Sequence, residues 1–199
     1  KYSFLGRKVW LNDMKFKVPT ITVIFLTAWF VAAPNMITAA TLAAAAVHEL
    51  GHIAAAKLMR IGISSITLLP LGADISFSRM RSYREEFVTA SAGAAVNLVT
   101  AIFCMPLAKS EFADLFVTSN IALAVMNLLP IKTLDGGGTL KSVFLMCLPQ
   151  DTAERVSGFI SSLFLFALWL LSVYLMLSSD GGFSLFALCS AIFISVYMS

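Results

Sequence analysis

The chain has 199 residues, of which 59% are hydrophobic and 13% are charged, and its formal net charge is +3. Soluble domains carry about twice that charged fraction, so the composition argues against a water-soluble enzyme. No basic run alternates with aromatic residues, so nucleic acid is not expected as a partner. The mean hydropathy of +0.87 instead predicts a polytopic membrane protein, with residues 1–199 forming one membrane-embedded domain and no additional soluble domain.

The apolar runs predict an all-α bundle of six transmembrane helices. Residues 1–18 are mixed and basic, and they predict an interfacial segment on the membrane surface. The six spans that follow are expected at residues 19–33, 36–59, 86–107, 115–129, 158–177 and 183–198. A short helix is expected at residues 139–148, before Pro149.

Positive charges are distributed asymmetrically between the predicted spans. With a cytoplasmic N-terminus, 13 of the 14 Lys and Arg residues lie on the cytoplasmic side and only Lys109 lies opposite. This bias follows the positive-inside rule and predicts an integral, multi-pass protein in the lipid bilayer with its N-terminus in the cytoplasm. The C-terminal end of the second span is then expected on the cytoplasmic side, and an active site near that end would open to the same side.

Residues 61–78, between the second and third spans, are too apolar for an ordinary loop and too interrupted for a span. β-Favouring residues flank a Pro and Gly turn at residues 70–72, which predicts a short membrane-associated β-hairpin. Two interpretations are open. The segment is either a re-entrant loop that fills space, or a strand edge offered to an extended substrate.

The second span carries the sequence HELGH, in which His48 and His52 are the only histidines of the chain and Glu49 follows the first. An i, i+4 spacing places both imidazoles on one helix face, where they can bind one metal ion. Such matches occur by chance, but ionisable groups inside a bilayer cost several kcal/mol unless they find partners. We therefore expect a metal site, with Glu49 beside a metal-bound water.

A catalytic zinc ion needs three protein ligands and one open position. Because no further histidine exists and the three cysteines lie far apart in apolar surroundings, a carboxylate is expected as the third ligand. Asp135 is the strongest candidate, since it lies in the broken stretch 130–138 on the same side as the end of the motif. Asp74 in the hairpin is the rival, whereas Glu111 and Asp114 are expected on the opposite side.

Three motifs in order, HELGH, SAGAAVN and NLLPIKTLDGG, resemble those of the site-2 protease family of intramembrane zinc metalloproteases. The LLPLG hairpin and compact bundle most resemble the stage IV sporulation FB type. The resemblance implies that His48, His52 and Asp135 bind one catalytic zinc ion and that Glu49 is the general base. It also implies that Asn127 helps to hold the substrate backbone or the oxyanion.

The chain departs from this family at two places. Gly93–Ala94 stands where the family usually has Gly-Pro, and Gly72–Ala73 stands where the hairpin usually ends in Gly-Gly. The first departure weakens any role for Asn97 in the third span, and Asp74 follows the second.

The expected function is hydrolysis of peptide bonds in transmembrane or membrane-associated substrates by a metal-activated water, with Glu49 as proton acceptor. The alternative is a zinc-binding membrane protein without proteolysis, either a degenerate protease that escorts clients or a metal transporter. Glu49 argues against the degenerate protease, because bare metal binding needs no base. The oligomeric state is open, a homo-oligomer included.

Overall fold

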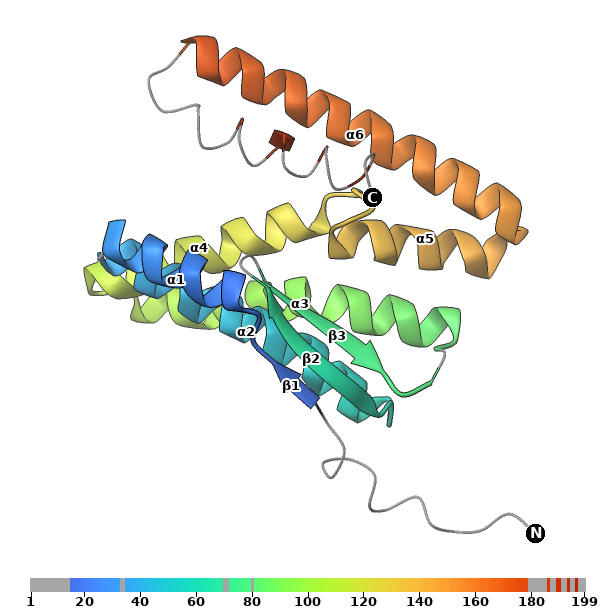
Figure 1. Cartoon of the computed structure of the whole chain (residues 1–199), viewed down its shortest axis with the longest axis horizontal. Coiled ribbons are helices and arrows are strands. Elements are labelled where there is room, and N and C mark those ends of the chain that lie inside the picture. Colours follow the sequence, from blue (N-terminus) through green and yellow to red (C-terminus); the bar gives the residue numbers. More distant parts are fainter. Residues whose placement is uncertain are drawn as a thin grey trace, which may run out of the picture.

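The computed structural model describes residues 15–32, 35–69, 72–79 and 81–178, together with residues 186, 189, 190, 193 and 196. The described part is mostly helical, with one small sheet (Figure 1). In chain order the elements are β1 (Lys15–Lys17), α1 (Thr20–Ala32), α2 (Met36–Leu58), β2 (Ile63–Leu69), β3 (Gly72–Phe77), α3 (Tyr83–Cys104), a 3₁₀ turn (Met105–Leu107), α4 (Glu111–Leu128), α5 (Asp135–Cys147) and α6 (Gln150–Ser178).

Four of these helices are long and apolar enough to cross a membrane. They are α2, α3 with its 3₁₀ turn, α4 and α6, which correspond to four of the predicted spans. Helix α1 has 13 residues, fewer than the roughly 20 that a helix needs to cross the hydrocarbon core. The predicted sixth span, residues 183–198, lies outside the described residues apart from five isolated positions. The protein is therefore an integral membrane protein, while the count of six spans stays a prediction, as does the single domain over residues 1–199.

Small side chains fill much of the core, and many large apolar side chains point outward. Fully buried positions include Ala40, Ala44, Ala94 and Ala124, on three of the candidate membrane helices. Small residues let membrane helices approach closely, because lipid gives no hydrophobic drive for burying large ones. The outward side chains include several that are more than two thirds exposed, namely Leu58, Phe103, Phe159 and Leu177. This distribution suits a lipid environment.

Polar caps decide where the membrane helices begin. The side chain of Asn35 accepts a hydrogen bond from the backbone N–H of Thr38 at the start of α2. Ser82 and Glu85 form a capping box, so α3 begins at Tyr83, three residues before the predicted start of the span.

The predicted hairpin is present and belongs to a three-stranded sheet in the order β1-β2-β3. Strands β2 and β3 are antiparallel, with Ile66 opposite Ile75, as expected for a hairpin. Strand β1 pairs in parallel with β2 and was not predicted, since it lies within the segment 1–18 that was interpreted as interfacial. Residues 1–14 of that segment and residues 70–71 of the predicted turn lie outside the described residues. This order leaves β3 as an edge strand.

The helices are arranged so that α3 contacts three neighbours, α2, α4 and α5. Helix α6 packs mainly on α5 and lies on the side away from the sheet (Figure 1). Gly51 allows α2 and α3 to meet, because a Cβ there would lie 2.8 Å from the carbonyl oxygen of Ala92. This close crossing brings the histidine face of α2 against α3.

Candidate metal centre

The two histidines of α2 lie one helical turn apart and face the same point. Their Nε2 atoms are 3.1 Å apart, and their rings meet edge to face with centroids 4.8 Å apart. His48 is 7% exposed, so its imidazole is removed from solvent and lipid. The predicted sharing of one helix face is confirmed.

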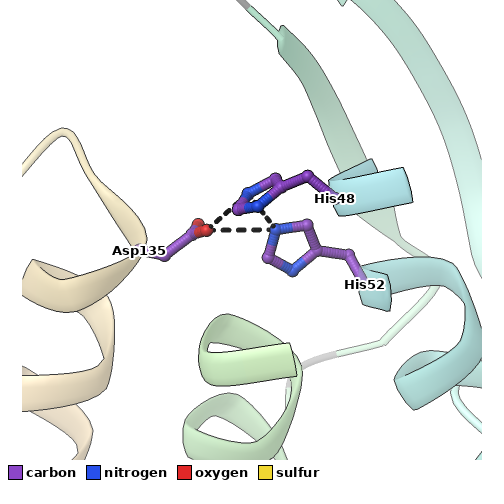
Figure 2. A group of neighbouring side chains, drawn as sticks. All are labelled: His48, His52 and Asp135. Atoms are coloured by element: carbon purple, nitrogen blue, oxygen red, sulfur yellow. Dashed lines mark hydrogen bonds and ion pairs between the residues drawn. The ribbon is translucent and has the colours of Figure 1, made fainter. Parts of the chain in front are cut away.

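Asp135 reaches the same point from the start of α5 (Figure 2). Its Oδ2 lies 2.9 Å from Nε2 of His48 and 3.1 Å from Nε2 of His52. One ligand atom from each residue lies within 4.8 Å of the other two. The structure thus brings together all three residues that the sequence suggested as metal ligands.

The segment before Asp135 differs from the prediction in one respect. Residues 130–138 were expected to be broken, with a helix from residue 139, but α5 begins at Asp135 itself. Gly136 and Gly137 make this early start possible, because a Cβ on them would lie 2.3 Å from Leu128 O and 2.2 Å from Ile131 O. The glycines therefore let the first turn of α5 lie against the backbone at the end of α4 and in the connection that follows it, which places the Asp135 carboxylate at the N-terminus of α5.

A hydrogen bond of 2.7 Å joins Nδ1 of His52 to the main-chain oxygen of Thr89 on α3. A carbonyl oxygen can only accept, so Nδ1 carries a proton, and in the neutral imidazole Nε2 then presents its lone pair to His48 and Asp135. An imidazole lone pair and a carboxylate facing each other in a buried place repel unless a cation lies between them. The hydrogen bond from Nδ1 of His52 to Thr89 O is also of the kind that orients metal-binding histidines.

The donor set and its spacing fit zinc. Two nitrogens and one carboxylate oxygen are a common set of three for catalytic zinc. Tetrahedral bonds of roughly 2.0–2.1 Å would place ligand atoms about 3.3 Å apart. The observed separations of 2.9 to 3.1 Å differ from that value by only a few tenths of an ångström.

Gly93 of α3 packs directly on the two imidazoles. A Cβ at this position would lie 2.5 Å from Nε2 of His52 and 2.7 Å from Nε2 of His48. The sequence showed Gly93–Ala94 as a departure from the family pattern, but it did not indicate that Gly93 borders the two imidazoles. Thr89 was also missed, because it contributes a main-chain oxygen that no side-chain pattern reveals.

A cavity of about 230 Å³ opens beside the three residues and holds the other two predicted site residues, Glu49 and Asn127. Oε1 of Glu49 accepts a hydrogen bond of 2.9 Å from the backbone N–H of Ala73 on β3. Nδ2 of Asn127 donates a hydrogen bond of 3.0 Å to Leu123 O within α4. The structure thus gathers all five predicted site residues around one space.

The rival carboxylates lie elsewhere. Asp74 is exposed, and side-chain alternation along β3 points it away from the face that carries Ala73. Glu111 and Asp114 stand in the first turn of α4, at the opposite end of that helix from Asn127. Among the described residues, only His48, His52 and Asp135 form a group of His, Cys, Asp or Glu side chains that could hold a metal ion.

Comparison with known proteins places this site in a family. The chain matches the profile of peptidase family M50 over residues 36–112 and 107–171. It is 31% identical over 142 residues to stage IV sporulation protein FB of Bacillus subtilis, covering 65% of this chain and 49% of the relative. It is 35% identical over 127 residues to the Synechocystis protein sll0528, named a candidate zinc metalloprotease, covering 59% and 33%. The chain thus spans half or less of the length of these curated relatives.

The fold also matches a solved structure, the site-2 protease from Methanocaldococcus jannaschii. The TM-score is 0.68, with 92% of this chain and 89% of that chain covered at 16% identity, which shows a shared fold. The resemblance to the site-2 proteases that the three motifs predicted is therefore confirmed. Because the family match runs from α2, which carries both histidines, to α6, beyond Asp135, the chain belongs to peptidase family M50.

Proposed function

We propose that this protein is an intramembrane zinc metalloprotease that hydrolyses peptide bonds of transmembrane or membrane-associated substrates. The observation that carries the proposal is the convergence of His48, His52 and Asp135 beside the cavity that holds Glu49. Membership of a peptidase family and the names of the relatives support the same activity. Four helices able to cross a membrane support a substrate that is itself membrane-embedded.

The chemistry assigns separate tasks to these residues. His48, His52 and Asp135 would hold one zinc ion, which when bound supplies Lewis acidity toward a peptide carbonyl and acidifies a water molecule. Glu49 takes a proton from the attacking water and later gives it to the leaving amine. Its second oxygen, Oε2, is buried and makes no hydrogen bond within the described part of the chain, so this atom is available for the proton.

The edge of β3 supports binding of an extended substrate segment. Ala73, Ile75 and Phe77 line a second cavity of about 170 Å³ together with His52 and Asp135. A strand at the edge of a sheet offers unpaired backbone groups to an added strand. A helical substrate must unwind before its peptide bond can be attacked, and pairing with β3 would stabilise the unwound form. This favours the substrate-binding interpretation of the hairpin over a loop that only fills space.

Asn127 is proposed to bind the substrate backbone or the oxyanion. It lines the same cavity as Glu49, and one of its two amide hydrogens is used by Leu123 O. The other hydrogen remains for a substrate oxygen, since an amide NH₂ carries two donors.

The cytoplasmic side is proposed for the N-terminus and for the opening of the site, because Lys and Arg residues are concentrated on that side of the predicted spans.

The decisive experiment incubates the purified full chain, reconstituted in liposomes with zinc, with a panel of membrane-anchored substrates. We expect cleavage within the embedded segment, loss of cleavage on chelation and recovery on adding zinc, with products identified by mass spectrometry. Tight zinc binding without any cleavage across the panel would indicate a degenerate protease. Zinc accumulation in the liposome lumen would indicate a transporter.

A further inference from the structure

Glu49 is held by the hairpin as well as by its own helix. Its Oε1 lies 2.9 Å from the backbone N of Ala73, which comes from a different element of the chain. Its Oε2 is buried without a hydrogen bond in the described residues. The two oxygens of one carboxylate therefore have distinct surroundings, one engaged and one not.

The Ala73 N–H is available because β3 is an edge strand. Backbone N–H groups along a strand point alternately to the two sides. The N–H of Ala73 points to Glu49, so it belongs to the set directed away from β2, and the N–H of Ile75 belongs to the same set. The contact with Glu49 therefore costs the hairpin none of its own β2–β3 hydrogen bonds.

Gly72 lets the chain approach the carboxylate closely. Its φ of +147° is a conformation that residues with a side chain rarely adopt. A Cβ on Gly72 would also lie 3.2 Å from Oε1 of Glu49. The backbone conformation and the short distance to Glu49 both favour glycine at position 72, directly before the Ala73 N–H donor.

We propose that the backbone N–H of Ala73 positions the Glu49 carboxylate for proton transfer. It fixes Oε1 and leaves Oε2 to accept the proton of the attacking water and to deliver it to the leaving amine. Ala73 is thus a positioning residue that acts through its main chain. The inference rests on the proposed role of Glu49 as general base. It assigns two separable roles to one strand edge, since Ala73 serves the base and Ile75 serves the substrate.

The test removes single N–H groups from this edge. Ala73→Pro deletes the donor at a position where an edge strand tolerates proline, and Ile75→Pro is the matched control two residues on. We expect Ala73→Pro to lower kcat by about 10- to 100-fold, with zinc content and KM nearly unchanged. Ile75→Pro should raise KM while largely preserving kcat. Equal effects of the two variants on KM alone, or an unchanged kcat in Ala73→Pro, would overturn the proposal.

A second variant avoids any change in backbone shape. Replacing Ala73 by lactic acid turns the Gly72–Ala73 amide into an ester, which removes the N–H and keeps the methyl side chain. The same loss of kcat is expected, and this variant decides the matter if Ala73→Pro fails to fold or loses zinc. In a Glu49→Gln background neither change should lower the residual rate further, because the proton acceptor is already gone.

Amide hydrogen exchange gives a readout that does not depend on activity. The Ala73 amide should exchange slowly in the wild type and faster in Glu49→Ala, whereas Ser76 on the same strand should be unaffected. Fast exchange of Ala73 in both proteins would contradict the contact. If Glu49→Gln retains cleavage, the proposed function itself fails. If Glu49→Gln is inactive while the ester variant is fully active, only this inference fails.

Discussion

Gly93 lies so close to His52 that a Cβ at this position would be 2.5 Å from the imidazole Nε2. The two residues come from neighbouring membrane helices, α3 and α2, which cross closely at Gly51. The absence of a side chain on α3 is therefore part of the geometry of the candidate metal centre. A methyl group here would push on the atoms that face Asp135.

The first prediction follows from this contact. Gly93→Ala should lower zinc content and cleavage together, because His52 must move away from His48 and Asp135 to make room. The matched control is Gly158→Ala on α6, where a Cβ would meet nothing within 4 Å. Zinc per protein, measured by atomic absorption, should fall in the first variant and stay at the wild-type level in the second. Full occupancy in Gly93→Ala would show that the histidines tolerate the displacement.

The second prediction separates metal binding from proton transfer. Glu49→Gln keeps the helix, both histidines and an acceptor for the Ala73 N–H, but removes the base. Zinc content should be near normal, while cleavage falls by about 10²- to 10⁴-fold, the usual contribution of general acid–base catalysis. Parallel metal analysis and cleavage assays check it. Activity within a few-fold of the wild type would mean that another group accepts the proton.

The third prediction concerns the carboxylate ligand. Asp135→Asn keeps the size of the side chain and removes the charge that two imidazoles face at 2.9 and 3.1 Å. An amide oxygen is a poor zinc ligand, so metal content and activity should both fall. Asp74→Asn, an exposed carboxylate on β3, is the control and should retain both. The reverse pattern, with zinc lost only in Asp74→Asn, would move the ligand role to the hairpin.

The fourth prediction tests sidedness with cysteine labelling. Cys147 is exposed at the end of α5, on the side proposed to face the cytoplasm, and Lys109 lies between α3 and α4 on the opposite side. In intact cells, an impermeant maleimide should label Lys109→Cys in a chain without other cysteines. A chain that keeps only Cys147 should be labelled only after permeabilisation. Labelling of Cys147 in intact cells would instead indicate the opposite orientation in the membrane.

Much of the fold follows from the sequence because a bilayer requires long apolar helices. The spans at α2, α3, α4 and α6 were predicted for that reason. The start of α3 was missed by three residues because Ser82 and Glu85 cap it through local hydrogen bonds. Strand β1 could not be predicted, since its three residues form a strand only by pairing with β2, far along the chain.

The site was predictable where side chains carry the chemistry at a fixed spacing. The i, i+4 histidines and the neighbouring Glu49 needed only helix geometry, whereas Asp135 needed exclusion of other ligands and the family resemblance. Thr89 and Ala73 were not predictable, because they act through a main-chain oxygen and a main-chain N–H. Contributions of that kind depend on how elements pack and leave no residue-type signal.

The last prediction concerns Asn127, whose amide lines the cavity beside Glu49 and Asp135. Its Nδ2 donates one hydrogen to Leu123 O, which orients the amide and leaves the second hydrogen for the substrate. If that hydrogen stabilises charge that develops on the peptide oxygen, Asn127→Ala should lower kcat by about 10²- to 10³-fold. Zinc content should not change, since His48, His52 and Asp135 all remain to hold the ion. Asn127→Gln keeps the amide but lengthens the side chain, so it should recover only part of the rate. An increase in KM with kcat preserved in Asn127→Ala would instead assign the residue to ground-state binding of the substrate backbone.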